Sequence, residues 1–245
     1  MKALVCGFSL ALFALAPLTA EEVIDVAIYR GPGVGGSGPD ALLKTLSARP
    51  AEFTARFVTP EEIRAGVLRE FDAVIFPGGS GSRQAEGLGG DGLEVVREFV
   101  RNGGGYLGIC AGCYLACENY SWSLKILDAK TKSQKWKRGT KVLELGFTEE
   151  AKPLLDLETA GVKYANGPVM EPAGSPDLPD FTTLAVFKTE TAENGTPAGI
   201  QVNSPAILSG TYGKGRVVGI SPHPEQSEGL EHIVPRLLRW SITGE

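Results

Sequence analysis

Cysteine and histidine are scarce in this sequence, which has four cysteines and two histidines among 245 residues. Cys6 lies in an apolar N-terminal run, and the other three, Cys110, Cys113 and Cys117, fall within a span of eight residues. Cysteines so close together cannot join distant parts of a fold, so a disulfide framework is excluded. If the N-terminal run is removed, the odd number of cysteines leaves at least one thiol free or reactive.

Long apolar runs are also missing, apart from one run that follows Lys2 and continues to Leu15. This run is too short to anchor the chain in a bilayer. Ala16-Pro17-Leu18-Thr19-Ala20 follows it, and the pattern is typical of a secretory signal that is cut after the last alanine. We therefore expect a signal peptide at residues 1–20, one domain at 21–245, and a secreted or periplasmic protein that is not membrane-bound after cleavage.

The sequence lacks a strongly basic composition, since 24 lysines and arginines stand against 29 aspartates and glutamates, for a net charge of -5. The one local basic cluster runs from Lys130 to Arg138 and contains Trp136. A tryptophan among cations could stack on a nucleic-acid base. The acidic balance of the whole chain favours a solvated hairpin instead, so we expect no nucleic-acid partner.

The first half of the chain alternates between predicted strands and helices. This alternation predicts a parallel, doubly wound α/β sheet. Thr59-Pro60-Glu61-Glu62 has the residues of a capped helix start, and Asp91 could cap a helix that ends near Gly103. The predicted strands in this half are residues 23–29, 53–58, 71–76 and 106–109.

The loop at residues 31–38 is rich in glycine, but no Gly-Lys-Ser/Thr follows as in a P-loop. Pro32 also interrupts the spacing of a dinucleotide fingerprint. We expect no cofactor and no bound metal.

The second half of the chain is richer in short β-type runs, which predict an antiparallel extension of the sheet. A turn is expected at Glu193-Asn194-Gly195. A last apolar stripe predicts a C-terminal helix that begins late or is kinked at Pro235. The predicted strands are residues 124–127, 141–145, 162–164, 183–188, 205–211 and 217–220.

Cys110 stands at the junction of a buried strand and a helix, with Gly108 and Gly112 on either side. This spacing is that of a nucleophile elbow with cysteine in place of serine. A sharp strand-to-helix turn leaves no room for a side chain on either flank, which accounts for both glycines. The positive end of the helix dipole favours a thiolate there. A plain turn with a buried cysteine would have the same local sequence.

A nucleophilic cysteine needs a base and an acceptor that orients the base. His223 follows the last predicted strand, and Glu225 would point the same way in an extended segment. His232 lies off the apolar stripe of the last helix. We therefore expect Cys110 as nucleophile, His223 as base and Glu225 as its orienting group.

A tetrahedral intermediate also needs N–H donors for its oxyanion. The amide of Ala111 at the helix start is one candidate. Gly78 or Gly79, after the third predicted strand, could supply another, because adjacent parallel strands would place that loop beside the elbow.

Three motifs occur in a fixed order: Pro-Gly-Gly at 77–79, Gly-Ile-Cys-Ala-Gly at 108–112 and His-Pro-Glu at 223–225. Together they resemble the class I glutamine amidotransferase-like superfamily, most closely the amidotransferase-like N-terminal domain of biotin–protein ligases. The resemblance implies a flavodoxin-like three-layer α/β sandwich with a mostly parallel sheet and an antiparallel β-rich extension. It implies that the triad falls on Cys110, His223 and Glu225. The resemblance also rests on residues 29–37, 164–168 and 212–229.

Tyr114 departs from the family pattern, because class I amidotransferases usually carry glutamine four residues after the nucleophile to help seat the substrate. The resemblance implies substrate-binding roles for position 114 and for Asn166. We expect a thiol hydrolase that cleaves a C–N amide bond of a small molecule or peptide through a thioester, and that is a poor glutaminase.

Three alternatives stay open at this point. Cys110 and Cys113 form a C-x-x-C pair at a helix start, which is typical of thiol–disulfide redox proteins. Cys110, Cys113 and Cys117 could bind a metal together with His223. A non-catalytic ligand-binding module on the same fold is the third. The sequence does not indicate the oligomeric state.

Overall fold

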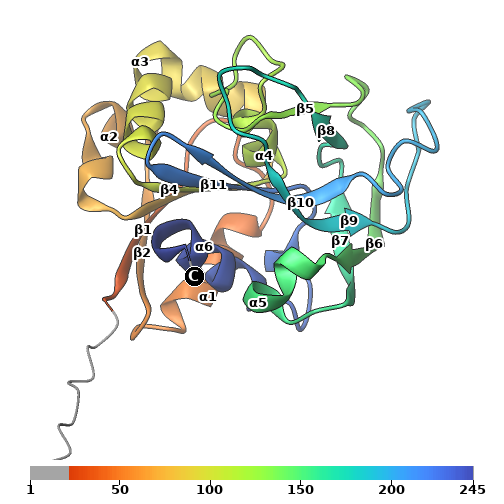
Figure 1. The fold of residues 1–245 in the computed structure, drawn as a ribbon. Coiled ribbons are helices and arrows are strands. Elements are labelled where there is room, and N and C mark those ends of the chain that lie inside the picture. The colour runs from red at the N-terminus through yellow and green to blue at the C-terminus, as the bar shows by residue number, and fades with distance from the viewer. Residues whose placement is uncertain (1–21, 245) are drawn as a thin grey trace, which may run out of the picture.

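The computed structural model describes residues 22–244, so the signal peptide predicted at 1–20 lies outside the described residues. Within them the chain forms a nine-stranded mixed sheet in the order β2-β1-β3-β4-β11-β10-β9-β6-β7, with helices on both faces (Figure 1). A two-stranded sheet, β5-β8, lies beside it. The strands are β1 Ile24–Tyr29, β2 Phe53–Val58, β3 Ala73–Phe76, β4 Gly105–Ile109, β5 Ala129–Thr131, β6 Thr140–Phe147, β7 Thr159–Ala165, β8 Met170–Pro172, β9 Thr182–Phe187, β10 Pro205–Tyr212 and β11 Gly215–Ile220.

Five strands form the parallel half of the large sheet. β1 pairs in parallel with β2 and β3, β3 with β4, and β4 with β11. Every residue of β3 and β4 is buried, as expected of strands covered by helices on both faces. The predicted α/β fold with a parallel core is confirmed, and the carboxyl ends of β3, β4 and β11 meet at one edge.

The antiparallel half continues the same sheet from β11 through β10, β9 and β6 to β7. The predicted antiparallel extension is therefore confirmed, although it contributes as many pairings to the large sheet as the parallel half does. The strand predicted at 124–127 is wrong. Leu124 donates to the Leu115 carbonyl, and Ile126 donates to the Ala116 carbonyl, so this segment is a loop that satisfies the end of α4.

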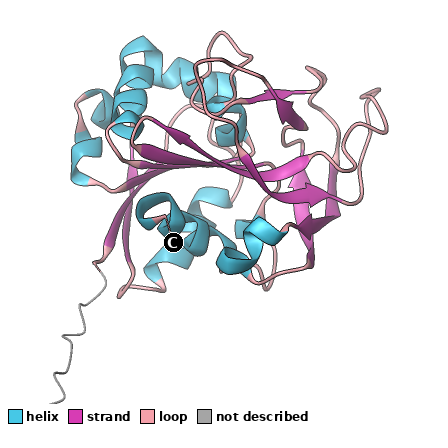
Figure 2. Cartoon of the chain, viewed as in Figure 1, coloured by secondary structure: helices cyan, strands magenta, loops and turns pink. Residues whose placement is uncertain are grey.

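The helices form two layers, visible above and below the sheet in Figures 1 and 2. Residues of α1 and α6 belong to the core cluster on one face, and residues of α2, α3 and α4 belong to the cluster on the other. The helices are α1 Gly38–Ser47, α2 Pro60–Arg64, α3 Gly81–Arg101, α4 Ala111–Ala116, α5 Lys152–Leu155 and α6 Ile233–Thr243, with 3-10 turns at Val67–Glu70, Glu149–Ala151 and Pro224–Gln226.

Two predicted helix starts have different outcomes. Thr59 caps α2 in a complete capping box: its hydroxyl accepts from the Glu62 amide, and the Glu62 carboxylate accepts from the Thr59 amide. In contrast, α3 begins at Gly81, ten residues before the predicted cap at Asp91. Gly89 has φ 64° and ψ 178° and kinks the helix, so the predicted helix corresponds to its second segment.

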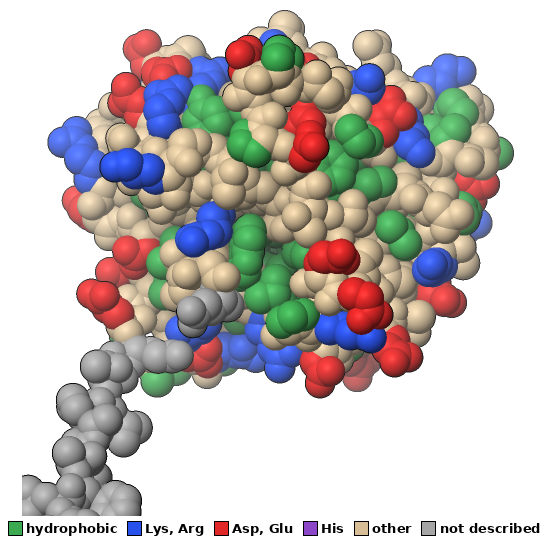
Figure 3. Space-filling view, viewed as in Figure 1, with side chains coloured by type: hydrophobic (Ala, Val, Ile, Leu, Met, Phe, Trp, Pro, Cys, Tyr) green, Lys and Arg blue, Asp and Glu red, His purple; other side chains and the backbone are tan. Residues whose placement is uncertain are grey.

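The C-terminal helix α6 begins at Ile233, two residues before Pro235, which agrees with the predicted late start. The turn expected at Glu193-Asn194-Gly195 is present, with positive φ at Asn194 and Gly195. Acidic and basic side chains are intermixed on the face shown in Figure 3. Between residues 22 and 244, no helix has the length and apolar character needed to cross a bilayer.

Candidate active site

Cys110 lies between β4 and α4 with φ 50° and ψ -97°, a conformation that side chains rarely adopt. Its amide donates to the Ile220 carbonyl at 2.7 Å, which ties the turn to β11. A Cβ at Gly108 would lie 2.9 Å from the Cys113 amide nitrogen, and one at Gly112 would lie 2.7 Å from the Phe76 Cβ. Both glycines are thus required by the close approach of neighbouring backbone, as an elbow predicts.

His223 and Glu225 reach the same edge of the sheet because β11 pairs with β4 in parallel. The segment after β11 therefore leaves the sheet beside the elbow. The His223 Nδ1 lies 2.8 Å from the Glu225 Oε1, and both residues are buried. This contact holds the Nδ1 edge of the imidazole toward the carboxylate.

The imidazole of His223 has a strongly shifted pKa. Burial lowers the pKa of His223. Hydrogen bonds and charge interactions with Cys110 and Glu225 raise it by more than burial lowers it, so that the pKa of His223 is about 10. The contacts with Cys110 and Glu225 therefore favour the positive imidazolium. The structure brings the three predicted residues together in this way.

Sequence reasoning missed a second set of contacts that holds the Glu225 carboxylate. The Gln226 Nε2 donates to Glu225 Oε1 at 3.0 Å, and the Gln226 Oε1 accepts from the Lys163 Nζ at 2.7 Å. The His223 amide donates to the Lys163 carbonyl, which ties the same segment to β7. No signal in the sequence links positions 163 and 226, because their proximity depends on the tertiary fold.

The loop after β3 lies against the glycine-rich loop after β1. Gly35 donates to the Gly78 carbonyl at 3.1 Å, and Ser80 donates to the Gly33 carbonyl at 2.7 Å. Because the carbonyl and the following N–H of a peptide point in opposite directions, the Gly79 N–H points away from Gly35. A Cβ at Gly78 would lie 2.7 Å from the His223 Cε1, so this loop borders the imidazole.

The other predicted oxyanion donor, Ala111, is the first residue of α4. The first N–H groups of a helix have no acceptor within the helix. Its amide is therefore free of intrahelical bonding at the position where the elbow turns.

Tyr114 and Asn166, for which the resemblance implies substrate binding, line the same cavity as Cys110, and their contacts are defined. The Tyr114 hydroxyl donates to the Asn166 carbonyl at 3.2 Å. Burial raises the pKa of the Tyr114 phenol well above its usual value, so it stays neutral. The Asn166 Oδ1 accepts from the Gly139 amide at 2.8 Å.

A cavity of about 230 Å³ opens at Cys110. Tyr114 and Asn166 form part of its wall. The sequence did not assign Tyr120, Trp122 and Gln134 to the site, although Trp136, singled out within the basic cluster, also lines it. The predicted solvated hairpin around Trp136 is wrong in part: residues 132–139 form a loop without strand structure, and Arg138 is buried and donates to the Pro197 carbonyl.

Cys113 and Cys117 lie in a different environment from Cys110. All three are free thiols in the structure. Cys113 and Cys117 are fully buried in the core cluster of α3 and α4, whereas Cys110 packs with the cluster on the opposite face. Burial raises the pKa of the Cys113 thiol well above its usual value. Among residues 22–244, no group of three or more histidines, cysteines, aspartates and glutamates could hold a metal ion.

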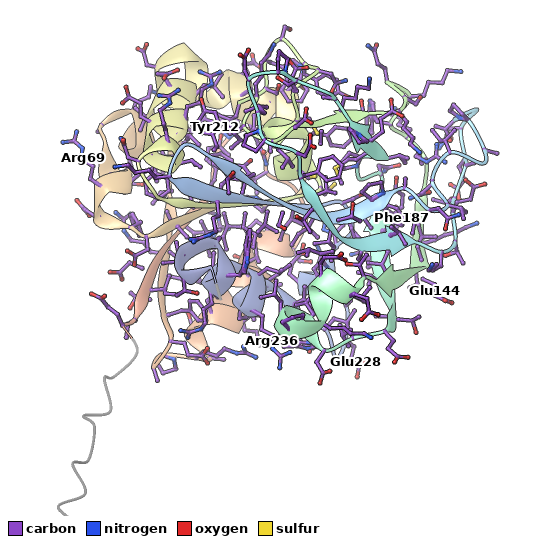
Figure 4. All side chains as sticks on the ribbon, in the orientation of Figure 1. Arg69, Glu144, Phe187, Tyr212, Glu228 and Arg236 are labelled. Atoms are coloured by element: carbon purple, nitrogen blue, oxygen red, sulfur yellow. The ribbon has the colours of Figure 1, made fainter. Side chains whose placement is uncertain are left out.

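A larger cavity of about 510 Å³ lies at the opposite edge of the parallel strands, lined by Arg69, Asp72 and Gly104 among others. Figure 4 labels Arg69 at the left edge of the molecule and Phe187 in the antiparallel half. Phe187 is buried edge-on against Tyr164 at a centroid distance of 5.6 Å. The larger cavity is lined by no cysteine, serine or histidine, so the site at Cys110 is the better candidate.

Residues 24–134 match the protein family described as "Biotin-protein ligase, N terminal". One relative, an uncharacterised protein of Chlamydia muridarum, is 41% identical over 49 residues, which is 20% of this chain. The chain covers 19% of that relative. The predicted resemblance to the biotin–protein ligase N-terminal domain is confirmed for the matched region.

Solved structures extend the likeness to the rest of the fold. A chain of PurLQS from Thermotoga maritima matches with a TM-score of 0.63 and 15% identity, covering 91% of this chain and 99% of the other. A ThuA-like protein from Parabacteroides merdae matches with a TM-score of 0.61 and 13% identity, and the match covers 91% of each chain. A β-galactosidase from Rahnella sp. R3 matches with a TM-score of 0.57 and 14% identity, and the match covers 89% of this chain and 31% of the β-galactosidase chain. The protein therefore has the class I glutamine amidotransferase-like fold.

Proposed function

We propose that this chain, which combines a biotin–protein ligase N-terminal region with the class I glutamine amidotransferase-like fold, is a cysteine-dependent amide hydrolase. The observation that carries the proposal is the strained backbone of Cys110, with φ 50°, beside the buried His223–Glu225 pair. Strain of this kind costs of the order of 1–3 kcal/mol and persists where surrounding structure enforces it, most often at functional sites.

In the first half of the reaction the Cys110 thiolate attacks the amide carbonyl carbon. A C–S bond forms, and the carbonyl electron pair moves to the oxygen, which accepts hydrogen bonds from the amides of Ala111 and of Gly78 or Gly79. The C–N bond then breaks, and His223 gives its proton to the leaving nitrogen. The products are a thioester on Cys110 and a free amine or ammonia.

In the second half His223, now neutral, takes a proton from a water molecule. The resulting hydroxide attacks the thioester carbon, a C–O bond forms and the C–S bond breaks. The carboxylic acid product leaves, and the Cys110 thiolate and the His223 imidazolium are restored. Glu225 holds the imidazole in the orientation that both steps need, since it accepts from Nδ1 and leaves Nε2 for the reacting groups.

The contacts of Tyr114 support an amide other than free glutamine. A phenol has a single hydroxyl, which here donates to the Asn166 carbonyl, so it cannot supply both the donor and the acceptor that a carboxamide side chain offers. A site that loses a polar contact to its substrate can lose orders of magnitude in selectivity. We therefore propose weak turnover of glutamine.

Separate locations for the three thiols argue against the redox alternative. Cys110 and Cys113 belong to core clusters on opposite faces of the sheet, which does not favour a Cys110–Cys113 disulfide. Cys113 Sγ instead lies 3.3 Å from the sulfur of Met170. A non-catalytic binding module remains the alternative that the experiment below distinguishes.

The test measures the rate at which iodoacetamide labels each cysteine, with peptide mapping, and ammonia release from amides under reducing conditions. We expect Cys110 to label fastest, His223→Ala to slow its labelling at neutral pH, and Glu225→Gln to slow it less. If Cys117 labels faster than Cys110, or both variants label like the wild type, the triad is refuted.

Turnover of glutamine separates the remaining possibilities. A rate of about 1 per second or faster, abolished by Cys110→Ala, would be ordinary enzyme performance and would restore a glutaminase assignment. A reactive Cys110 that forms no acyl adduct with any amide would favour the binding module.

Export is part of the proposal and rests on the sequence at residues 1–20. The expected mature N-terminus is Glu21. N-terminal sequencing of the protein from an exported fraction tests this, and an intact Met1 in that fraction would contradict it.

A further inference from the structure

We propose that the amide that reacts at Cys110 is uncharged and bears a planar, apolar group. This inference rests on the proposed function and names its substrate class. It follows from two properties of the cavity at Cys110: its wall lacks charged side chains, and aromatic rings form much of it.

The first property is the absence of charge. None of the twelve residues that line the cavity is aspartate, glutamate, lysine, arginine or histidine. Apart from the reacting Cys110, the polar side chains of the wall are neutral, and they come from Ser80, Ser82, Gln134 and Asn166 in addition to the phenols. Such groups can orient a neutral amide by hydrogen bonds, but they cannot neutralise an ion.

Free glutamine would enter as a zwitterion with a carboxylate and an ammonium group. A charged group that leaves water without a charged partner pays a large desolvation cost. A neutral amide loses only the hydration of its polar atoms, and serine, asparagine and glutamine side chains can replace the lost hydrogen bonds. The wall therefore selects against amino acids and for amides without ionised groups.

The second property is the set of rings. Tyr120 and Trp122 stack at a centroid distance of 4.6 Å, and Tyr114 meets Tyr120 edge-on at 6.2 Å. Trp136, half-exposed, lines the cavity from the separate segment at 132–139. Aromatic faces of this kind bind planar groups by stacking or edge contacts.

The size of the cavity fits a single ring. An apolar cavity of about 150 Å³ can hold benzene, so the 230 Å³ here accommodates a ring of that size together with a carboxamide. A long peptide or an oligosaccharide would not fit within this volume.

The experiment compares three alkylating probes with the same reactive group: chloroacetamide, its N-phenyl derivative and its N-carboxymethyl derivative. Second-order rate constants at Cys110 are divided by those for free glutathione, which removes differences in intrinsic reactivity. We expect the phenyl probe to exceed the parent by about tenfold, a factor that corresponds to about 1.4 kcal/mol. The carboxymethyl probe should be slower than the parent.

Variants locate the source of the preference. Trp136→Ala should reduce the phenyl-to-parent ratio toward the value for glutathione, and Trp136→Phe should keep most of it. Trp122→Ala should have the same effect as Trp136→Ala, with circular dichroism to confirm folding. Val142→Ala, at a position 72% exposed on β6, is the control and should keep the wild-type ratio.

Substrates provide the second readout. Benzamide should release ammonia with a kcat/KM at least tenfold above that of glutamine, and Trp136→Ala should narrow this difference. If Cys110 reacts with all three probes in the ratios found for glutathione, the substrate inference is overturned while the proposed function stands. If no probe labels Cys110 faster than Cys117, the proposed function falls as well.

Discussion

Among the glycines of the described chain, Gly112 and Gly79 have the least space for a side chain, and Gly112 lies at the elbow. A methyl group there would overlap the carbonyl of Phe76 at the end of β3. Overpacking of this kind costs about 1–3 kcal/mol because backbone has to move. We expect Gly112→Ala to lower the free energy of unfolding, measured by urea denaturation, by at least that amount and to slow Cys110 alkylation.

Gly90→Ala is the matched control for that substitution. Gly90 is exposed within α3, and a Cβ there meets nothing within 4 Å. Because Gly90 directly follows the kink at Gly89, we expect Gly90→Ala to change the free energy of unfolding by less than about 1 kcal/mol. Equal stability changes for the two variants would contradict the crowding at the elbow.

His223 makes stability depend on pH in a defined direction. Its folded pKa of about 10 exceeds the ordinary value of 6.5. Stability from the bound proton is therefore fully present below about pH 6.5 and is lost as the pH rises through about 10. We expect the free energy of unfolding to fall over this window.

Cys110→Ala tests this pH dependence, because it removes one of the two groups that raise the His223 pKa. Its unfolding free energy should fall less steeply between pH 6.5 and 10 than that of the wild type. Identical slopes would show that Cys110 does not interact with the imidazole.

The residues that the sequence could predict are those whose role depends on local spacing. Cys110 was identified from two glycines, and His223 with Glu225 from a short motif after a strand. Lys163, Gln226 and Trp122 could not be identified, because each acts through a contact with a residue far away in the sequence. Trp136 was noticed but assigned to a solvated segment, since nothing local indicates that the segment covers the elbow.

At the level of elements, α2 shows how much a short helix depends on its cap. The helix has five residues, and its capping box consists of Thr59 and Glu62. Thr59→Ala should lower the free energy of unfolding by about 1 kcal/mol. Urea denaturation measures the change, and Thr59→Ser, which keeps the hydroxyl, should lose much less.

The two errors in predicted elements share a cause. Residues 124–127 are apolar enough for a strand, yet their amides pair with the end of α4 rather than with another strand. The first segment of α3 contains Gly81 and Gly87 and so has a weak helical signal. In both cases tertiary packing decides the conformation against local preference.

In the whole molecule, the two halves of the sheet contribute different parts of the site. The parallel half supplies Cys110, His223 and the loop of Gly78. The antiparallel half and its loops supply Ala165 and Asn166 at the end of β7, and Trp136 before β6. Substitutions in the second half should therefore alter which amide is accepted more than whether Cys110 reacts.

The unusual backbone at Cys110 has a consequence for the stability of the whole chain. Glycine normally destabilises a structure by about 0.5–1 kcal/mol relative to alanine. At φ 50° and ψ -97° the order should reverse, because glycine relieves strain of the order of 1–3 kcal/mol. We expect Cys110→Gly to melt about 2–4 °C above Cys110→Ala, and a lower melting temperature would show that the turn is unstrained.

The reversed stability order of glycine and alanine at position 110 has consequences for evolution and for protein engineering. A lineage that no longer needed the thiol would keep more stability by replacing this cysteine with glycine than with alanine, so selection for folding alone would favour glycine at this position. For a designer, glycine is the replacement that removes the thiol with the smaller expected loss of stability. Under the proposed function, such a variant would bind small neutral amides without cleaving them.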